Sequence, residues 1–156
     1  MKIINKNKKV NYLSYLNNYK MINKKKLSTI KNFFLKTKEN SRICLHQNTD
    51  DTHQEMIILQ KKHSYFPPKK NIKSDQTFFI IEGRLMIIIF DNKGNIKSKI
   101  ILSKKNNLML RVKKNTFHCD IPLSKFAIHY ESKNCKFNKF TNKLAKFKFN
   151  FSQLKN

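Results

Sequence analysis

The side chains able to ligate a metal or to react as nucleophiles are few and widely spaced in this chain of 156 residues. Three of the five histidines show no ligand spacing to one another and are expected to be surface residues or core filling: His53, His63 and His129. The cysteines are odd in number and share no close spacing: Cys44, Cys119 and Cys135. This pattern argues against a disulfide framework and against a zinc knuckle, so we expect reduced thiols in a cytoplasmic protein.

A denser polar group lies between Pro67 and Gly83, where Lys69 and Gln76 precede a short apolar run, and His118 lies on a later predicted strand. If Lys69 points into a cavity, its ammonium can attract a carboxylate or a phosphate, and the Gln76 amide can donate a hydrogen bond to the same ligand. We expect His118 to be a hydrogen-bonded histidine of that pocket.

The net charge of +25 comes almost entirely from lysine, because only Arg42, Arg84 and Arg111 of the 34 basic residues are arginines. Lys, Asn, Ile and Phe dominate, whereas Gly, Ala, Arg and Pro are scarce, which is the bias of an AT-rich genome. Phosphate-reading surfaces favour arginine, and much of the excess charge lies in residues 1–39 and 133–156. Non-specific binding of polyanions at low salt is expected, and a nucleic-acid-binding protein is the second alternative function.

Neither a leader nor a membrane span is predicted. The first six residues lack an apolar core, so we expect no signal peptide. The longest purely apolar run, Leu85 to Phe90, is too short to cross a bilayer. We therefore expect a cytoplasmic protein without membrane insertion.

The periodicity predicts one mainly β domain over residues 26–137, between a basic arm (1–25) and a basic aromatic tail (138–156). The arm is expected to begin poorly ordered, and a short helix is predicted over residues 27–37 with Ser28 as N-cap. Strands are predicted at 55–60, 77–81, 85–90, 96–102, 108–112, 116–118 and 126–131. Their spacing of about ten residues, without crossover helices, indicates an antiparallel sandwich or barrel. In the tail, the phenylalanines are expected to cover one face of the sandwich: Phe137, Phe140, Phe147, Phe149 and Phe151. Phe147, Phe149 and Phe151 also alternate as an extra strand would, so an extra strand is the alternative for this segment.

Two turns punctuate these strands. Gly83 lies in a tight connection and is expected to adopt positive φ. The stretch from Asp91 to Asn95 is the clearest hairpin turn in the chain.

The first metal motif of cupins, His-x-His-x4-Glu-x6-Gly, has spacings that fall on Lys69, Asn71, Gln76 and Gly83, and His118 matches a later histidine ligand. From about Leu27 to Phe137 the chain resembles WbuC-type cupins, small proteins of surface-polysaccharide gene clusters. The resemblance rests on an ordered set of short matches: residues 42–46, Asp51, Met56, Tyr65 with Pro67 and Pro68, 78–83, 90–94, 115–118 and 131–133. It implies a double-stranded β-helix jelly roll, a divalent metal in the barrel mouth and frequently a dimer.

The metal ligands are where the chain departs from that family. Lysine, asparagine and glutamine replace two imidazoles and a carboxylate, and a protonated ammonium cannot ligate. A lysine charge about 4 Å from a dication is repelled by roughly 8 kcal/mol at an effective dielectric near 20. We therefore expect no bound metal. The alternative, a Zn, Fe or Mn ion, has only His118 as a ligand, because Lys69, Asn71 and Gln76 occupy the other positions. Asn115 replaces a glycine of the second motif, a mild change because Asn tolerates the left-handed region.

The resemblance and the residues together predict a metal-free cupin-like domain that binds a sugar derivative or an anion, linked to surface-glycan biosynthesis. The expected pocket residues are Arg42, His46, Tyr65, Lys69, Gln76, Phe78, Phe117 and His118. The alternative is an active isomerase or epimerase of this fold, in which His118 is the base and Tyr65 or Tyr130 the acid. No catalytic residue is assigned beyond this pair, and a homodimer is expected from the resemblance.

Overall fold

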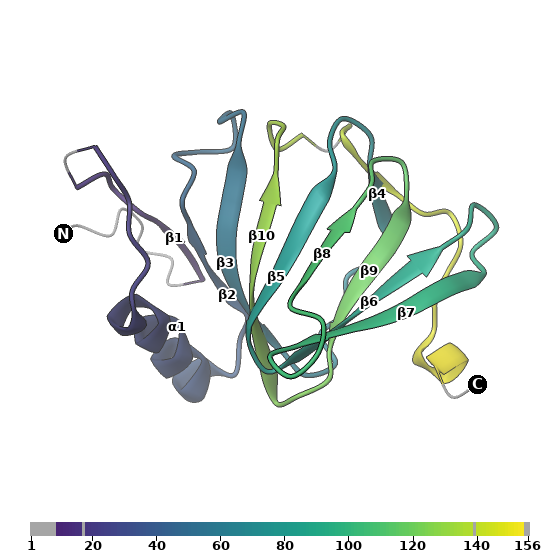
Figure 1. Ribbon diagram of the computed structural model, residues 1–156, viewed down its shortest axis with the longest axis horizontal. Coiled ribbons are helices and arrows are strands. Elements are labelled where there is room, and N and C mark those ends of the chain that lie inside the picture. The colour runs from purple at the N-terminus through teal and green to yellow at the C-terminus, as the bar shows by residue number, and fades with distance from the viewer. Residues whose placement is uncertain (1–8, 17, 139, 155–156) are drawn as a thin grey trace.

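Two facing β-sheets form the body of the protein in the computed structural model, which describes residues 9–16, 18–138 and 140–154 (Figure 1). The six-stranded sheet has the order β1 (Val10–Tyr12), β2 (Ser41–Cys44), β3 (Gln54–Lys61), β10 (Phe126–Lys133), β5 (Gln76–Glu82), β8 (Met109–Val112). The five-stranded sheet has the order β11 (Asn142–Leu144), β4 (Lys69–Asn71), β9 (Phe117–Pro122), β6 (Arg84–Phe90), β7 (Ile96–Ser103). The predicted all-β jelly roll is confirmed.

The helix α1 (Lys24–Thr37) covers the outer face of the six-stranded sheet. It begins three residues earlier than predicted, because the Asn23 side chain, rather than that of Ser28, accepts a hydrogen bond from the Lys26 N–H at 3.1 Å. Asparagine is as good an N-cap as serine, so the predicted cap was wrong but its chemistry is the same. The helix ends at Lys38, which adopts φ 58°.

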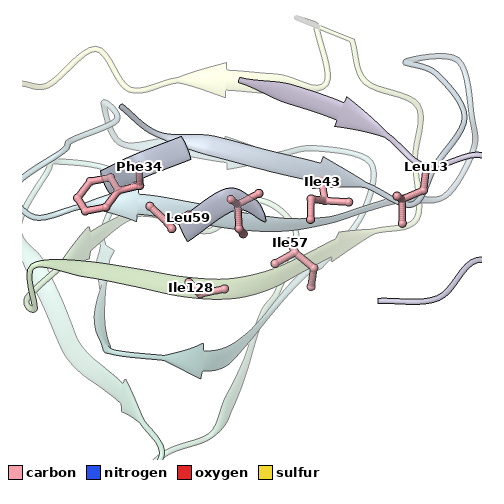
Figure 2. Close-up of a cluster of buried hydrophobic side chains, with 7 residues drawn as sticks. Leu13, Phe34, Ile43, Ile57, Leu59 and Ile128 are labelled. Atoms are coloured by element: carbon pink, nitrogen blue, oxygen red, sulfur yellow. The ribbon is translucent and has the colours of Figure 1, made fainter. Parts of the chain in front are cut away.

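A first hydrophobic core lies between α1 and the six-stranded sheet. Figure 2 shows its buried side chains, which come from the helix, from the segment after β1 and from three strands: Leu13, Phe34, Ile43, Ile57, Leu59 and Ile128. Burying a Leu, Ile or Phe side chain contributes about 1.5–3 kcal/mol. Because successive side chains of a strand point to opposite faces, the residues between these core positions face the space between the sheets, as His129 and Glu131 of β10 do.

A second core fills the space between the two sheets toward one end. Its members come from β5, β6, β7 and β8 and from the start of β10: Phe78, Ile80, Leu85, Ile87, Leu102, Val112 and Ala127. The other end of this interior is lined by polar side chains, which are described below.

The C-terminal segment covers the outer face of the five-stranded sheet. Phe147 and Phe149 pack against Phe90 with ring centroids 5.4 Å apart in each case, and Phe149 is buried. Phe147 and Phe149 therefore cover one face of the sandwich, as expected. The alternative of an extra strand at 147–151 is wrong: the tail pairs with β4 earlier, through β11, and ends in the short helix η1 (Phe151–Leu154). The phenylalanines hold this segment by ring packing, which does not require backbone pairing.

The predicted backbone turns are present. Gly83 adopts φ 83°, and a Cβ there would collide with the Phe126 carbonyl oxygen. Asn115 adopts φ 65°, and its N–H donates to the Asn71 carbonyl at 2.7 Å, which ties the loop before β9 to the end of β4. At the hairpin, Asp91 Oδ1 accepts hydrogen bonds from the N–H groups of Lys93 and Asn95.

Part of the basic arm is ordered against the sheet. Residues 10–12 form β1, which pairs in parallel with β2, so the expectations of an unstructured start and of purely antiparallel pairing do not hold for this segment. Residues 1–8, where the expectation of a poorly ordered arm also applies, lie outside the described residues. No helix among the described residues is long and apolar enough to cross a membrane.

Candidate functional site

A cavity of about 470 Å³ opens into the polar end of the barrel interior. Its walls come from both sheets and from β1 at the edge. The polar and charged side chains that line it include Arg42, His46, Gln60, Lys69, Asp120, Glu131 and Lys133. Three of the predicted pocket residues, Arg42, His46 and Lys69, therefore lie on its surface.

The four positions predicted from the cupin spacing lie together in the structure. Lys69 is opposite His118 in the pairing of β4 with β9. Asn71 Nδ2 donates to Gln76 Oε1 at 2.7 Å, and His118 Nε2 lies 3.1 Å from the same oxygen. We call Asn71, Gln76 and His118 the amide relay. All three are at least 98% buried. Lys70 points away from this group, with its Nζ 4.7 Å from the Phe117 ring centroid.

His118 is held between two oxygen acceptors. Its Nδ1 lies 2.9 Å from the Thr116 carbonyl oxygen, while Nε2 faces Gln76. Burial lowers the pKa of His118, and the charge of Lys69 adds to this effect, against the opposing influence of the Thr116 bond and of nearby carboxylates. A ring kept neutral in this way can donate to only one of the two oxygens at a time.

A divalent cation of the usual cupin kind does not fit the amide relay and Lys69. The Lys69 ammonium has no lone pair for a metal, and the Asn71 amide nitrogen donates to Gln76, so Asn71 Oδ1 is the one ligand atom that these two side chains offer. Gln76 Oε1 already accepts from Asn71 and faces His118 Nε2, so the oxygen and the imidazole nitrogen are directed at each other rather than at a shared ion. Asn71, Gln76 and His118 contact one another through side-chain hydrogen-bonding groups, whereas Lys69 Nζ makes no hydrogen bond or ion pair with the described residues.

Glu131 connects the amide relay to a second group. Its Oε2 accepts from Gln76 Nε2 at 2.9 Å, and its Oε1 lies 3.0 Å from His129 Nε2. Burial favours the neutral acid, but the His129 hydrogen bond and the charges of His129, Lys69 and Lys133 outweigh it and lower the pKa of Glu131 to about 2. Glu131 is therefore a carboxylate at neutral pH.

Asp120, His129 and Glu131 form this second group, which we call the acidic cluster. A ligating atom of each lies within 4.8 Å of those of the others. Sequence reasoning missed the group: it ended the β9 strand at His118, assigned His129 to the surface or the core, and used Glu131 only as a mark of resemblance. The alternation of side chains along a strand could have indicated the cluster. Residues two apart on one strand share a face, as His118 and Asp120 do on β9 and His129 and Glu131 do on β10.

Cationic side chains lie nearer the entrance. Arg42 is exposed, Lys69 is half-buried and Lys133 is buried. Burial lowers the pKa of Lys133, and repulsion from Lys69 lowers it further. Lys69 Nζ makes no hydrogen bond or ion pair within the described part of the chain. The entrance of the cavity therefore carries the positive charges of Arg42, Lys69 and Lys133, and Lys69 forms no ion pair with a carboxylate of the described residues.

The remaining predicted pocket residues lie around the cavity rather than in it. Phe78 is fully buried beneath the amide relay, with its ring centroid 5.9 Å from that of His118. Phe117 and Tyr65 pack on the outer face of the five-stranded sheet, against the C-terminal segment. His46, by contrast, lines the cavity, with its Nδ1 2.8 Å from the Glu55 carbonyl oxygen, and burial lowers its pKa.

The predicted acid and base of an epimerase are not brought together. The Tyr130 hydroxyl donates to Glu55, and the ring packs on the core beneath α1, across the sheet from His129. Tyr65 also faces away from His118, toward Phe149. Neither tyrosine lines the cavity.

Comparison with known proteins gives a partial family match and a clear fold match. Residues 29–102, just under half of the chain, match a family model described as Domain of unknown function (DUF6016). No curated protein matches the sequence. The match ends before β9 and β10, the strands that carry His118 and the acidic cluster.

Several solved structures share the architecture at low identity. SO0799 from Shewanella oneidensis is 11% identical over 61% of this chain and 63% of its own, with a TM-score of 0.52. CapF from Staphylococcus aureus, a capsular polysaccharide assembling protein, is 12% identical over 62% of this chain and 28% of its own, with a TM-score of 0.54. A structure of CapF with the inhibitor 3-isopropenyl-tropolone gives a TM-score of 0.58, with 12% identity over 69% of this chain and 32% of that one.

KdgF from Halomonas sp. is 12% identical over 65% of this chain and 84% of its own, with a TM-score of 0.51. This chain therefore spans less than two thirds of SO0799 and about a third of CapF or less. These neighbours are cupin-fold proteins, and the two-sheet arrangement described above agrees with theirs. The chain has the cupin fold.

Proposed function

We propose that this protein is a cupin-fold binding domain that takes a small anionic molecule, such as a sugar phosphate or a sugar carboxylate, into the cavity between its sheets. The observation that carries the proposal is the ammonium of Lys69. It lines the cavity without a hydrogen bond or ion pair to any described residue, at the position where the cupin spacing puts the first metal ligand.

The other cations of the entrance support the same ligand charge. An anion between Lys69 and Lys133 relieves the repulsion that lowers the pKa of Lys133. Arg42 lies on the rim of the same cavity and offers a planar pair of donors for a carboxylate or phosphate. The cavity volume of about 470 Å³ is within the range of small-molecule sites.

The proposal includes loss of the usual cupin metal and a role in surface-glycan biosynthesis. The amide relay supports the first part, because its hydrogen bonds replace the coordination that a metal would require. For the second part the support is the resemblance to WbuC-type cupins, together with the shared fold of a capsular polysaccharide assembling protein. The tyrosine positions give the epimerase alternative no support.

Calorimetric titration of the full chain with glucose 1-phosphate, glucuronate and inorganic phosphate tests the proposal. The matched variants are Lys69→Met and Lys70→Met, because these lysines are neighbours on β4 but only Lys69 lines the cavity. We expect Lys69→Met to weaken binding at least tenfold, about 1.4 kcal/mol, and Lys70→Met to change it less than threefold. Equal losses in both variants would mean non-specific attraction to a basic surface and would contradict the proposal.

A further inference from the structure

The acidic cluster offers metal-ligating atoms at a place distinct from the usual cupin position. Asp120 comes from β9, and His129 and Glu131 come from β10. Their strand neighbours Cys119 and Tyr130 pack in the outer cores, so the three cluster side chains face the interior. One ligating atom from each lies within 4.8 Å of the others.

Asp120 has an unsatisfied carboxylate. The residue is 3% exposed, and its side chain makes no hydrogen bond or ion pair with any residue the structure describes. Glu131 differs, because its two oxygens are matched by Gln76 and His129. The Asp120 carboxylate therefore faces the cavity without a protein partner among the described residues, where a cation can reach its oxygens.

Gln60 supplies an independent second observation. It is 1% exposed and lines the same cavity as Asp120 and Glu131. Its Nε2 donates weakly to the backbone oxygens of Ser64 and Asp120, at 3.3 and 3.4 Å, while its Oε1 is buried without a partner among the described residues. An amide oxygen in this state is a ready ligand for a hard cation.

We propose that Asp120, His129 and Glu131 bind a divalent transition-metal cation of the Mn²⁺, Fe²⁺ or Zn²⁺ class, with Gln60 Oε1 as an additional oxygen ligand. One imidazole with carboxylate and carbonyl oxygens is a donor set that these ions accept. Ligands about 2.0–2.2 Å from an ion lie roughly 3–4.4 Å from one another, which the spacing of the cluster allows. If His129 ligates through Nε2, a neutral imidazole carries its proton on Nδ1, which is buried without a partner among the described residues, and a charged imidazole releases one proton to solvent.

This site excludes His118, which belongs to the amide relay, and does not depend on the proposed anionic ligand. Lys69 and Lys133 lie close enough to influence Glu131, so they weaken the attraction for a cation. Removal of the Lys69 charge is therefore expected to tighten cation binding, the opposite of its expected effect on an anion. Because the two effects have opposite signs, one proposal can fail without the other.

The test is titration of the chelator-stripped full chain with Mn²⁺ and with Zn²⁺, by calorimetry and, for Mn²⁺, by electron paramagnetic resonance. We expect Asp120→Asn to weaken binding at least about 100-fold and Lys69→Met to tighten it about tenfold. Asp50→Asn, the same chemical change at an exposed position, is the matched control and is expected to stay within about threefold of the unmodified chain.

His118→Asn distinguishes the two positions in the barrel. If the ion lies at Asp120, the His118→Asn variant keeps its cation affinity. If the ion lies at the usual cupin position, the variant loses about as much cation affinity as is expected for Asp120→Asn, and that result would overturn the proposal. Absence of binding at about 1 mM of either ion overturns it as well.

A crystal of the unmodified chain soaked in Mn²⁺ decides without any variant, in case Asp120→Asn does not fold. Anomalous density in contact with the Asp120 carboxylate supports the proposal. Density beside Asn71 and His118, or no density in the barrel, contradicts it.

Discussion

The amide relay and the acidic cluster lie in the same barrel interior, but their buried polar atoms differ in how they are hydrogen bonded. In the amide relay, Gln76 uses both ends of its side chain, so that Asn71, His118 and Glu131 are all connected through it. In the acidic cluster, His129 and Glu131 contact each other, but the Asp120 carboxylate makes no hydrogen bond or ion pair with the residues that the structure describes. The relay connects its side chains to one another and to Glu131, with Asn71 Oδ1 left without a hydrogen-bond partner among the described residues, whereas the Asp120 carboxylate forms no hydrogen bond or ion pair with any of those residues.

The largest expected effect tests the relay. Replacing Gln76 with Leu leaves Glu131 Oε2, Asn71 Nδ2 and the facing His118 nitrogen without their partner in a dry interior. We expect a loss of about 2–4 kcal/mol in the free energy of unfolding, measured with urea. Thr77→Val, on the same strand but on the other face, is the control and should cost less than about 1 kcal/mol. Equal losses would show that the relay is not a special source of stability.

The second prediction contrasts two carboxylates of the acidic cluster. In metal-free protein, Asp120→Asn is expected to raise the free energy of unfolding by about 1–2 kcal/mol, because it removes an unpaired buried charge. Glu131→Gln is expected to lower it by about 1–3 kcal/mol, because it weakens two satisfied contacts. Chemical unfolding in the presence of a chelator measures both. A loss of stability in Asp120→Asn would mean that this carboxylate has a partner after all, and the comparison would fail.

The third prediction concerns His46, which belongs to neither group and makes the free energy of unfolding sensitive to acid. Burial lowers the pKa of His46 in the folded protein below its ordinary value of 6.5, so the unfolded chain binds a proton first as pH falls. His46 therefore contributes stability above pH 6.5 that is lost as pH falls from 6.5 toward its lowered pKa. His46→Gln is expected to flatten this part of the stability profile, measured by thermal unfolding between pH 7.5 and 5. An unchanged slope would assign the acid sensitivity to another group.

The smallest expected effect is on the rate of thiol labelling. It tests which side chains of β9 face the barrel interior, on which the comparison of the relay with the cluster depends. Cys119 lies between His118 and Asp120 in sequence but is buried on the opposite side of β9, and burial raises the pKa of its thiol. Burial also raises the pKa of Cys44 to about 11. At pH 8 we expect a disulfide reagent to label Cys135 first and the other two only on unfolding. Rapid labelling of Cys119 in the folded protein would show that the strand faces are reversed.

Much of the fold followed from the sequence, because strand alternation, Gly83 and the turn at Asp91 are local signals. The convergence of Lys69, Asn71, Gln76 and His118 was also predicted, from the spacing of a known motif. The acidic cluster was not, because it depends on which strands are neighbours, and the sequence does not state that β9 and β10 both border the same cavity. The C-terminal strand was wrong because alternating phenylalanines can also arise where rings pack on a curved face without pairing.

The N-terminal β1 has a practical consequence for how the protein should be produced. It lies along the outer edge of the six-stranded sheet, and Lys9, Val10 and Tyr12 form part of the cavity wall. A truncated version starting at residue 26 would lose that wall and bare the hydrogen-bonding edge of β2, a template for aggregation. If such a shortened protein bound a ligand weakly, the cause would be the missing cavity wall and not the choice of ligand.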